Sequence, residues 1–138
     1  MTVKGFLKEN VQQQETLKII VSKRFIDENK KVIPFKIKGI NEAQIARIEE
    51  LCTKRGYKNG VPYEKLDTVA YNLKLVTACT EKPNFKDAAL QESWGANSAE
   101  DLAAKMLLAG EFLKLDAAVK KVCGFNLNFE GLKKQVKN

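Results

Sequence analysis

The chain has 138 residues, of which 44% are hydrophobic and 30% charged, a balance typical of folded globular proteins and unlike that of disordered chains. Its length predicts a single domain over residues 1–138 with one compact core. It contains no histidine, which excludes catalytic sites built on imidazole and most zinc sites.

The net charge of +7 is spread along the chain, with basic ends and a mildly acidic middle. The longest cationic runs are pairs such as Lys30-Lys31 and Lys133-Lys134. Nucleic-acid-binding proteins usually gather Lys and Arg on one face or helix. The spacing therefore favours solvated lysines over a nucleic-acid site.

Neither a secretion signal nor a membrane span is predicted. The N-terminal residues lack the uninterrupted apolar stretch of a signal peptide, and no segment approaches the roughly 20 apolar residues that cross a bilayer. We therefore expect a protein kept in the cytoplasm. Cys52, Cys79 and Cys123 are odd in number and form no C-x-x-C pair, which indicates small core residues and not disulfides.

Two strands are predicted near the N-terminus, at about residues 16–26 and 31–39. Their alternating apolar residues are Leu17, Ile19 and Val21 in the first, and Ile33, Phe35 and Ile37 in the second. The polar stretch 27–30 between them has turn composition, so an antiparallel hairpin over about 16–39 follows. Pro34 has no N–H to donate, which predicts that the second strand lies at a sheet edge.

After the hairpin, the apolar period becomes helical. The predicted helices span about residues 41–55, 62–79, 85–94, 98–109 and 111–123. Asn41 with Gln44 predicts a capping box at the first of them, and Ser98 with Asp101 predicts an N-cap at the fourth.

Glycine and proline set the remaining boundaries. Residues 56–60 are predicted to be a loop, and Pro62 suits the first turn of the second helix. Gly124 predicts the end of the last helix, with Phe125 folding back in a Schellman cap. The predicted fold class is α+β, mainly α: an N-terminal antiparallel β-hairpin followed by a bundle of four to five helices.

The sequence offers no catalytic constellation. It has no glycine-rich phosphate-binding motif. The adjacent carboxylates Glu49-Glu50 and Glu100-Asp101 would point in different directions on a helix, which favours solvation and capping over acid–base work or magnesium binding. We therefore predict no enzyme activity, metal site or cofactor.

The segment from Leu102 to Phe125 is more apolar than one core-facing helix stripe requires. It could be buried on several sides, or part of it could meet a partner. Burial is favoured, because large exposed apolar patches are uncommon on monomers. The candidate partner contacts are Trp94, Leu108, Phe112 and Phe125, although each also suits the core.

Several motifs together resemble the XkdN-like phage tail assembly chaperones. They are VSKRF at residues 21–25, FKI at 35–37, CTK at 52–54, CT at 79–80 followed by Pro83, KDAALQESWG at 86–95, MLLAGEF at 106–112 and GF at 124–125. They follow in the family's order over nearly the whole chain. Two departures are Asn29-Lys30, where a glycine often closes the hairpin, and Phe35, where tryptophan is common.

The resemblance implies a non-catalytic cytoplasmic helper of tail assembly that is absent from the mature virion. Such proteins are thought to bind the tape measure protein and to help bring tail tube subunits to it. Self-association into a homo-oligomer stays open. The alternatives are a nucleic-acid-binding accessory protein, favoured by the positive charge, and a structural tail component that stays in the virion.

Overall fold

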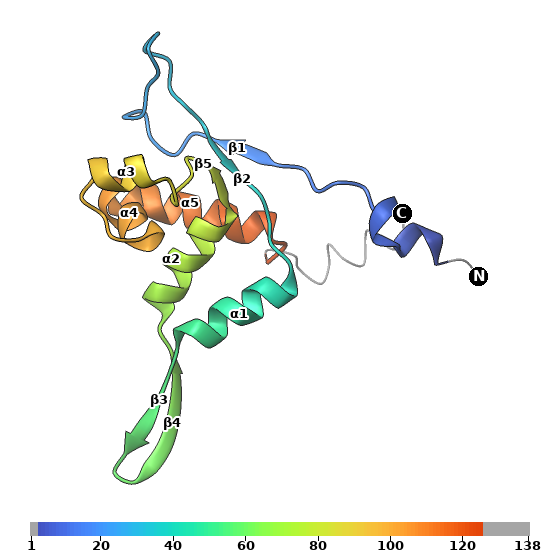
Figure 1. Cartoon of the computed structure of the whole chain (residues 1–138), viewed down its shortest axis with the longest axis vertical. Coiled ribbons are helices and arrows are strands. Elements are labelled where there is room, and N and C mark those ends of the chain that lie inside the picture. Colours follow the sequence, from blue (N-terminus) through green and yellow to red (C-terminus); the bar gives the residue numbers. More distant parts are fainter. Residues whose placement is uncertain (1–2, 126–138) are drawn as a thin grey trace.

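The computed structural model describes residues 3–125, which form five α-helices, five β-strands and two short 3-10 helices (Figure 1). The α-helices are α1 (Glu42–Cys52), α2 (Thr68–Cys79), α3 (Ala88–Ser93), α4 (Ala99–Met106) and α5 (Ala109–Val122). The strands are β1 (Leu17–Ile19), β2 (Phe35–Ile37), β3 (Thr53–Lys58), β4 (Val61–Leu66) and β5 (Thr80–Lys82). The 3-10 helices, η1 (Lys4–Phe6) and η2 (Lys8–Asn10), precede them.

The prediction of one N-terminal hairpin followed only by helices is wrong. The strands form two sheets, and three of the five strands lie after the first long helix. One sheet has the order β1-β2-β5 with antiparallel neighbours, and the other consists of β3 and β4 alone. Strands are therefore interspersed among the helices as far as β5, and α3, α4 and α5 then follow in succession.

In the three-stranded sheet β2 is central, so the edge position predicted from Pro34 is wrong. β5 pairs with β2 on the side away from β1, and the Lys38 N–H donates to the Cys79 carbonyl at 2.8 Å. Pro34 lies just before the first paired residue of β2, where its missing N–H removes no bond from the ladder.

The predicted hairpin over residues 16–39 is only partly present. Leu17 pairs with Ile37 at one end, while the isolated bridge between Ile26 and Val32 has a different register. At the tip, the Asp27 carboxylate accepts the N–H of Asn29 and of Lys31, at 2.8 and 3.0 Å. The two strands are therefore joined by irregular chain and a side-chain-stabilised turn instead of one continuous ladder.

The loop predicted at residues 56–60 and the helix start predicted at Pro62 are also wrong. Residues 53–66 form a two-stranded hairpin, which we call the arm. Its turn residues Asn59 and Gly60 have φ of 53° and 79°, as the two central residues of a type I′ turn require. Helix α2 starts only after Asp67, whose side chain accepts the Ala70 N–H at 3.1 Å.

The predicted helix caps are confirmed, and each of them is formed by residues a few positions apart in the sequence. Asn41 and Gln44 form the capping box with bonds of 2.9 and 3.0 Å, and Ser98 accepts the Asp101 N–H at 3.0 Å. At the end of α5, Gly124 has a φ of 89° and the Phe125 N–H donates to the Lys120 carbonyl at 3.0 Å, which is the Schellman arrangement.

The core lies where α2 meets the three-stranded sheet, α1, α4 and α5. Its buried members are Val21, Phe35, Ile37, Ile45, Leu75, Val76, Cys79, Phe85, Leu102, Ala103, Met106, Leu107, Leu115 and Val119. The arm contributes no residue to this core and projects away from the ends of α1 and α2 (Figure 1). Among residues 3–125 no helix has both the length and the apolar character needed to cross a bilayer.

Candidate functional site

An apolar groove of about 430 Å³ opens on the helical side of the molecule, between α2, α4 and α5. It is lined by Val69, Asn72 and Leu73 of α2, Ala103 and Ala104 of α4, Leu107, and Ala109 and Phe112 of α5. Asn72 is the one polar residue of this lining. The three alanines leave room for another backbone to approach closely, which bulkier side chains would prevent.

Large apolar side chains are also exposed beside the groove. Leu108 adjoins two lining residues in sequence and is 61% exposed, and Leu113 follows Phe112 and is 66% exposed. Val69, within the lining, is 70% exposed. The groove and these side chains together are called the groove surface below.

The junction of α4 and α5 decides which leucine is exposed. Helix α4 ends at Met106 and α5 begins at Ala109, so the boundary predicted near Gly110 lies too far along the chain. Leu107 is buried at 7% exposure, whereas Leu108 faces outward. The Glu111 carboxylate accepts the Leu108 N–H at 2.9 Å, which starts α5 before Gly110.

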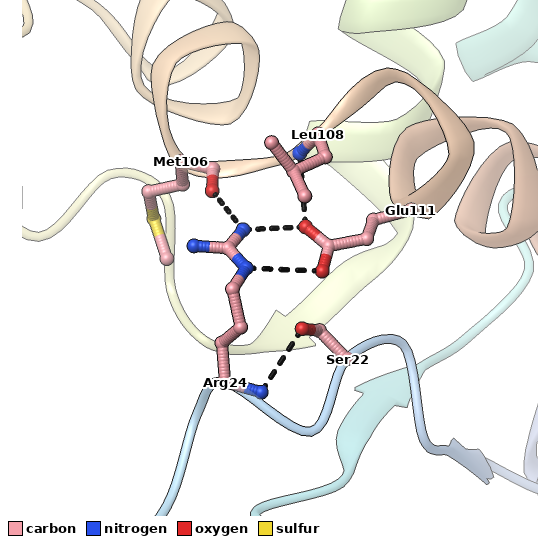
Figure 2. Close-up of polar contacts among 5 residues, drawn as sticks. All are labelled: Ser22, Arg24, Met106, Leu108 and Glu111. Atoms are coloured by element: carbon pink, nitrogen blue, oxygen red, sulfur yellow. Dashed lines mark hydrogen bonds and ion pairs between the residues drawn. The ribbon is translucent and has the colours of Figure 1, made fainter.

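A polar cluster fixes this junction to the N-terminal part of the chain (Figure 2). The Arg24 guanidinium donates through Nε to Glu111 Oε2 at 3.1 Å, and through Nη2 both to Glu111 Oε1 and to the Met106 carbonyl, the latter at 2.9 Å. The Arg24 backbone N–H in turn donates to Ser22 Oγ at 3.1 Å. We call these contacts the Arg24–Glu111 latch.

Electrostatics favour the charged form of Glu111. The hydrogen bonds from Arg24, together with those from the Ser22 hydroxyl and the Leu108 N–H, lower the pKa of Glu111 to about 2. A carboxylate in the first turn of α5 is also favoured by the helix dipole. The latch is therefore charged at neutral pH and holds Leu108 and the start of α5 in place.

The four candidate partner contacts do not share one site. Leu108 and Phe112 lie together at the start of α5, where the Phe112 N–H donates to the Leu108 carbonyl at 2.9 Å. Trp94 ends α3, and Phe125 lies past the far end of α5, which is about 21 Å long. Neither Trp94 nor Phe125 lines the groove.

The α2 wall was absent from the candidates. Val69 and Leu73 both line the groove, although neither is among the candidate partner contacts. Their helical spacing is the same for a core stripe and for a groove wall, so the only sequence signal is the surplus of apolar residues in α2 and in the segment after Leu102.

Burial raises the pKa of both Cys52 and Cys79, which makes these two thiols poor nucleophiles. Cys52 and Cys79 are buried, and burial raises the pKa of the Cys79 thiol to about 12. Cys79 Sγ lies 3.8 Å from Cys123 Sγ, and both are free thiols. Within residues 3–125 no group of three or more Cys, Asp or Glu side chains is arranged to hold a metal ion.

Comparison with known proteins places this geometry in context. The family model described as phage XkdN-like tail assembly chaperone protein matches residues 3–137. Two proteins of Bacillus subtilis (strain 168), the uncharacterized protein YqbN and the phage-like element PBSX protein XkdN, are each 27% identical over 135 residues, 96% of this chain and 91% of theirs. The crystal structure of YqbN has the same fold, with a TM-score of 0.80 and 23% identity over 91% of this chain and 98% of that one.

Proposed function

Since the chain belongs to the XkdN-like family of phage tail assembly chaperones, we propose that it binds a helical segment of the tape measure protein in the groove between α2, α4 and α5, without catalysing a reaction. The observation that carries this proposal is the groove surface itself. An apolar groove flanked by exposed leucines suits the apolar stripe of an amphipathic helix.

The groove supports a helical client in particular. Three alanines in its lining let a helix backbone approach, while Phe112 and Leu73 provide large apolar contacts. A tape measure helix placed there would bury side chains that otherwise draw unassembled chains together. The mechanism is therefore the covering of apolar surface before assembly.

Binding of this kind is reversible. The groove is short, and the surface around it consists of single exposed residues and not of an extended apolar sheet. Obligate interfaces are larger and more hydrophobic than standard ones. A client held here can leave when its helices pack against tail tube subunits.

The latch supports binding indirectly. A rigid groove loses less conformational entropy when a client binds than a mobile one does. By fixing the α4–α5 junction, Arg24 and Glu111 keep Leu108 exposed and Phe112 in the groove wall. These two charged residues are thus positioning residues for the binding surface.

A pull-down with the tape measure protein tests the proposal. We expect wild-type protein to keep a co-expressed tape measure protein soluble and to retain it on a column. Leu108→Asp with Leu113→Asp places two charges beside the groove, and we expect binding to weaken at least tenfold, because burying one leucine contributes about 1.5–3 kcal/mol and about 1.4 kcal/mol corresponds to a tenfold change in affinity. Both residues are exposed, so the fold should persist.

The matched control is Val11→Asp, which changes an exposed apolar residue far from α5 in sequence. We expect it to bind as wild type. Equal binding by the double variant, or a tape measure protein that is equally soluble alone, would contradict the proposal.

We further propose that the protein acts in the host cytoplasm and is absent from finished particles, because a client-covering surface must be vacated before tail tube subunits assemble. Mass spectrometry of purified virions should detect tape measure and tube peptides but none from this chain. Stoichiometric recovery of this chain from virions would instead identify a structural tail component.

A further inference from the structure

The arm projects away from the core of the protein (Figure 1). None of its strand residues is buried, and it extends beyond the helices (Figure 1). Isolated two-stranded hairpins are only marginally stable in water. Here the type I′ turn, the Tyr63 ring lying against Gly56, and the ion pair between Arg55 and Glu64 at 2.9 Å support the arm.

Strand pairing divides the arm into two faces of different charge. The cross-strand pairs Lys54 with Lys65, Gly56 with Tyr63, and Lys58 with Val61 place these six residues on the same face, because alternate residues of a strand share a face. We call this the lysine face. It bears three lysines and no carboxylate, and Val61 and Tyr63 on it are 63% and 46% exposed.

The opposite face is close to neutral. Arg55 donates to Glu64 at 2.9 Å and to Glu50 at 3.0 Å, so its charge is already balanced. On the lysine face, only Lys54 has an acidic partner, Asp67 at 3.3 Å near the base of the arm. The surplus positive charge of the arm therefore belongs to the lysine face, beside exposed apolar side chains.

The arm is poorly suited to pair with a second copy of itself. Pro62 removes a donor from β4, and prolines of this kind discourage strand addition at edges. Antiparallel pairing of two β3 strands about Gly56 would place Lys54 of one copy opposite Lys58 of the other, and like charges directly opposite destabilise a ladder.

We propose that the lysine face docks an extended acidic segment of another protein. Carboxylates of that segment would meet Lys54, Lys58 and Lys65, while Val61 and Tyr63 contact its apolar side chains. A nucleic acid fits less well, because the lysine face offers three lysines, one of them already paired with Asp67, beside two exposed apolar side chains, and not the continuous basic row that a phosphate backbone requires. The proposal concerns a surface separate from the groove.

An NMR titration of the full chain tests this docking surface. The probe is an alternating Glu-Thr dodecapeptide, and its uncharged counterpart is an alternating Gln-Thr dodecapeptide. We expect the acidic peptide to shift the amides of residues 53–66 saturably at low salt and less at high salt, since ion pairs at exposed sites are screened. The Gln-Thr peptide should leave these amides unchanged.

Charge-neutralising variants provide the second part of the test. Lys54→Gln, Lys58→Gln and Lys65→Gln together should weaken binding of the acidic peptide about tenfold, because three exposed ion pairs are lost. The matched control combines Lys18→Gln, Lys31→Gln and Lys114→Gln, which removes three exposed lysines elsewhere and should bind as wild type.

Three results would overturn the proposal: no shift of the arm amides, equal loss in both triple variants, or binding of an oligothymidylate of matched charge as tightly as the acidic peptide. The last result would identify a nucleic-acid surface. Because Leu108→Asp with Leu113→Asp leaves the arm unchanged, that variant should still bind the acidic peptide. A negative result for peptide binding at the arm can therefore be distinguished from a negative result for client binding at the groove.

Discussion

Gly39 lies where the chain leaves β2 for α1, against the end of α5. A Cβ added at this position would be 2.8 Å from the carbonyl oxygen of Val122 and 2.5 Å from Nε2 of Gln14. The glutamine side chain can move away, but the helix backbone cannot do so without a shift of α5. Because Gly39 carries no side chain, the chain after β2 and the end of α5 can approach each other closely.

We predict that Gly39→Ala lowers the free energy of unfolding by about 1–3 kcal/mol, the usual cost of overpacking. The control is Gly110→Ala: nothing lies within 4 Å of an added Cβ at Gly110, and alanine is the better helix former, so stability should stay equal or rise by up to about 1 kcal/mol. Urea denaturation measures both. Equal destabilisation by the two variants would contradict the close approach.

At the scale of elements, the Arg24–Glu111 latch joins the segment just before the isolated bridge between Ile26 and Val32 to the α4–α5 junction. Arg24 contacts the end of α4 through the Met106 carbonyl and the start of α5 through Glu111. Because the pKa of Glu111 in the folded protein lies below its ordinary value of 4.5, folding is favoured by its ionised form. That contribution is complete above about pH 4.5 and is lost as the pH falls toward 2.

We therefore predict that Glu111→Gln makes the protein less stable at pH 7 and reduces the fall in melting temperature between pH 4.5 and pH 2. Thermal unfolding followed by circular dichroism over this range measures the effect. Glu28→Gln, at an exposed turn position, is the control and should leave both the neutral-pH stability and the acid profile unchanged. A Glu111→Gln profile parallel to wild type would contradict the role of the latch.

Local signals explain which elements could be predicted from sequence. The caps at Asn41, Ser98 and Gly124 depend on residues a few positions apart, and each was found where the sequence indicated. The arm had a local signal too, since Asn59-Gly60 between Tyr57 and Val61 is typical of a type I′ hairpin. It was missed because Pro62 was given more weight as a helix start.

Contacts between residues far apart in the sequence explain which features could not be predicted. β5 has only three residues and becomes a strand because β2, far earlier in the chain, offers it an edge. The exposure of Leu108 and burial of Leu107 likewise depend on where α4 ends, which Arg24 helps to set from a distant segment. A pair of adjacent leucines carries no signal for this difference, so the candidate site could be predicted only in part.

At the scale of the whole molecule, the base of the arm adjoins one end of the groove in sequence. Val69, in the first turn of α2, lines the groove just after β4 ends, so the arm emerges beside one end of the groove. Figure 1 shows the arm on the side of the molecule where α1 ends and α2 begins, away from α3. In this layout the proposed site for an apolar helix is on the body of the protein, and the proposed site for an acidic segment is on the arm.

Site-specific photo-crosslinking tests the central claim, client binding at the groove, most directly. The photoreactive residue p-benzoylphenylalanine replaces Leu108 in one variant and Val11 in another, in cells that also produce the tape measure protein. We predict a crosslink from position 108 to a helix-forming tape measure segment, mapped by mass spectrometry, and none above background from position 11. Equal crosslinking at both positions, or none at position 108, would contradict the account.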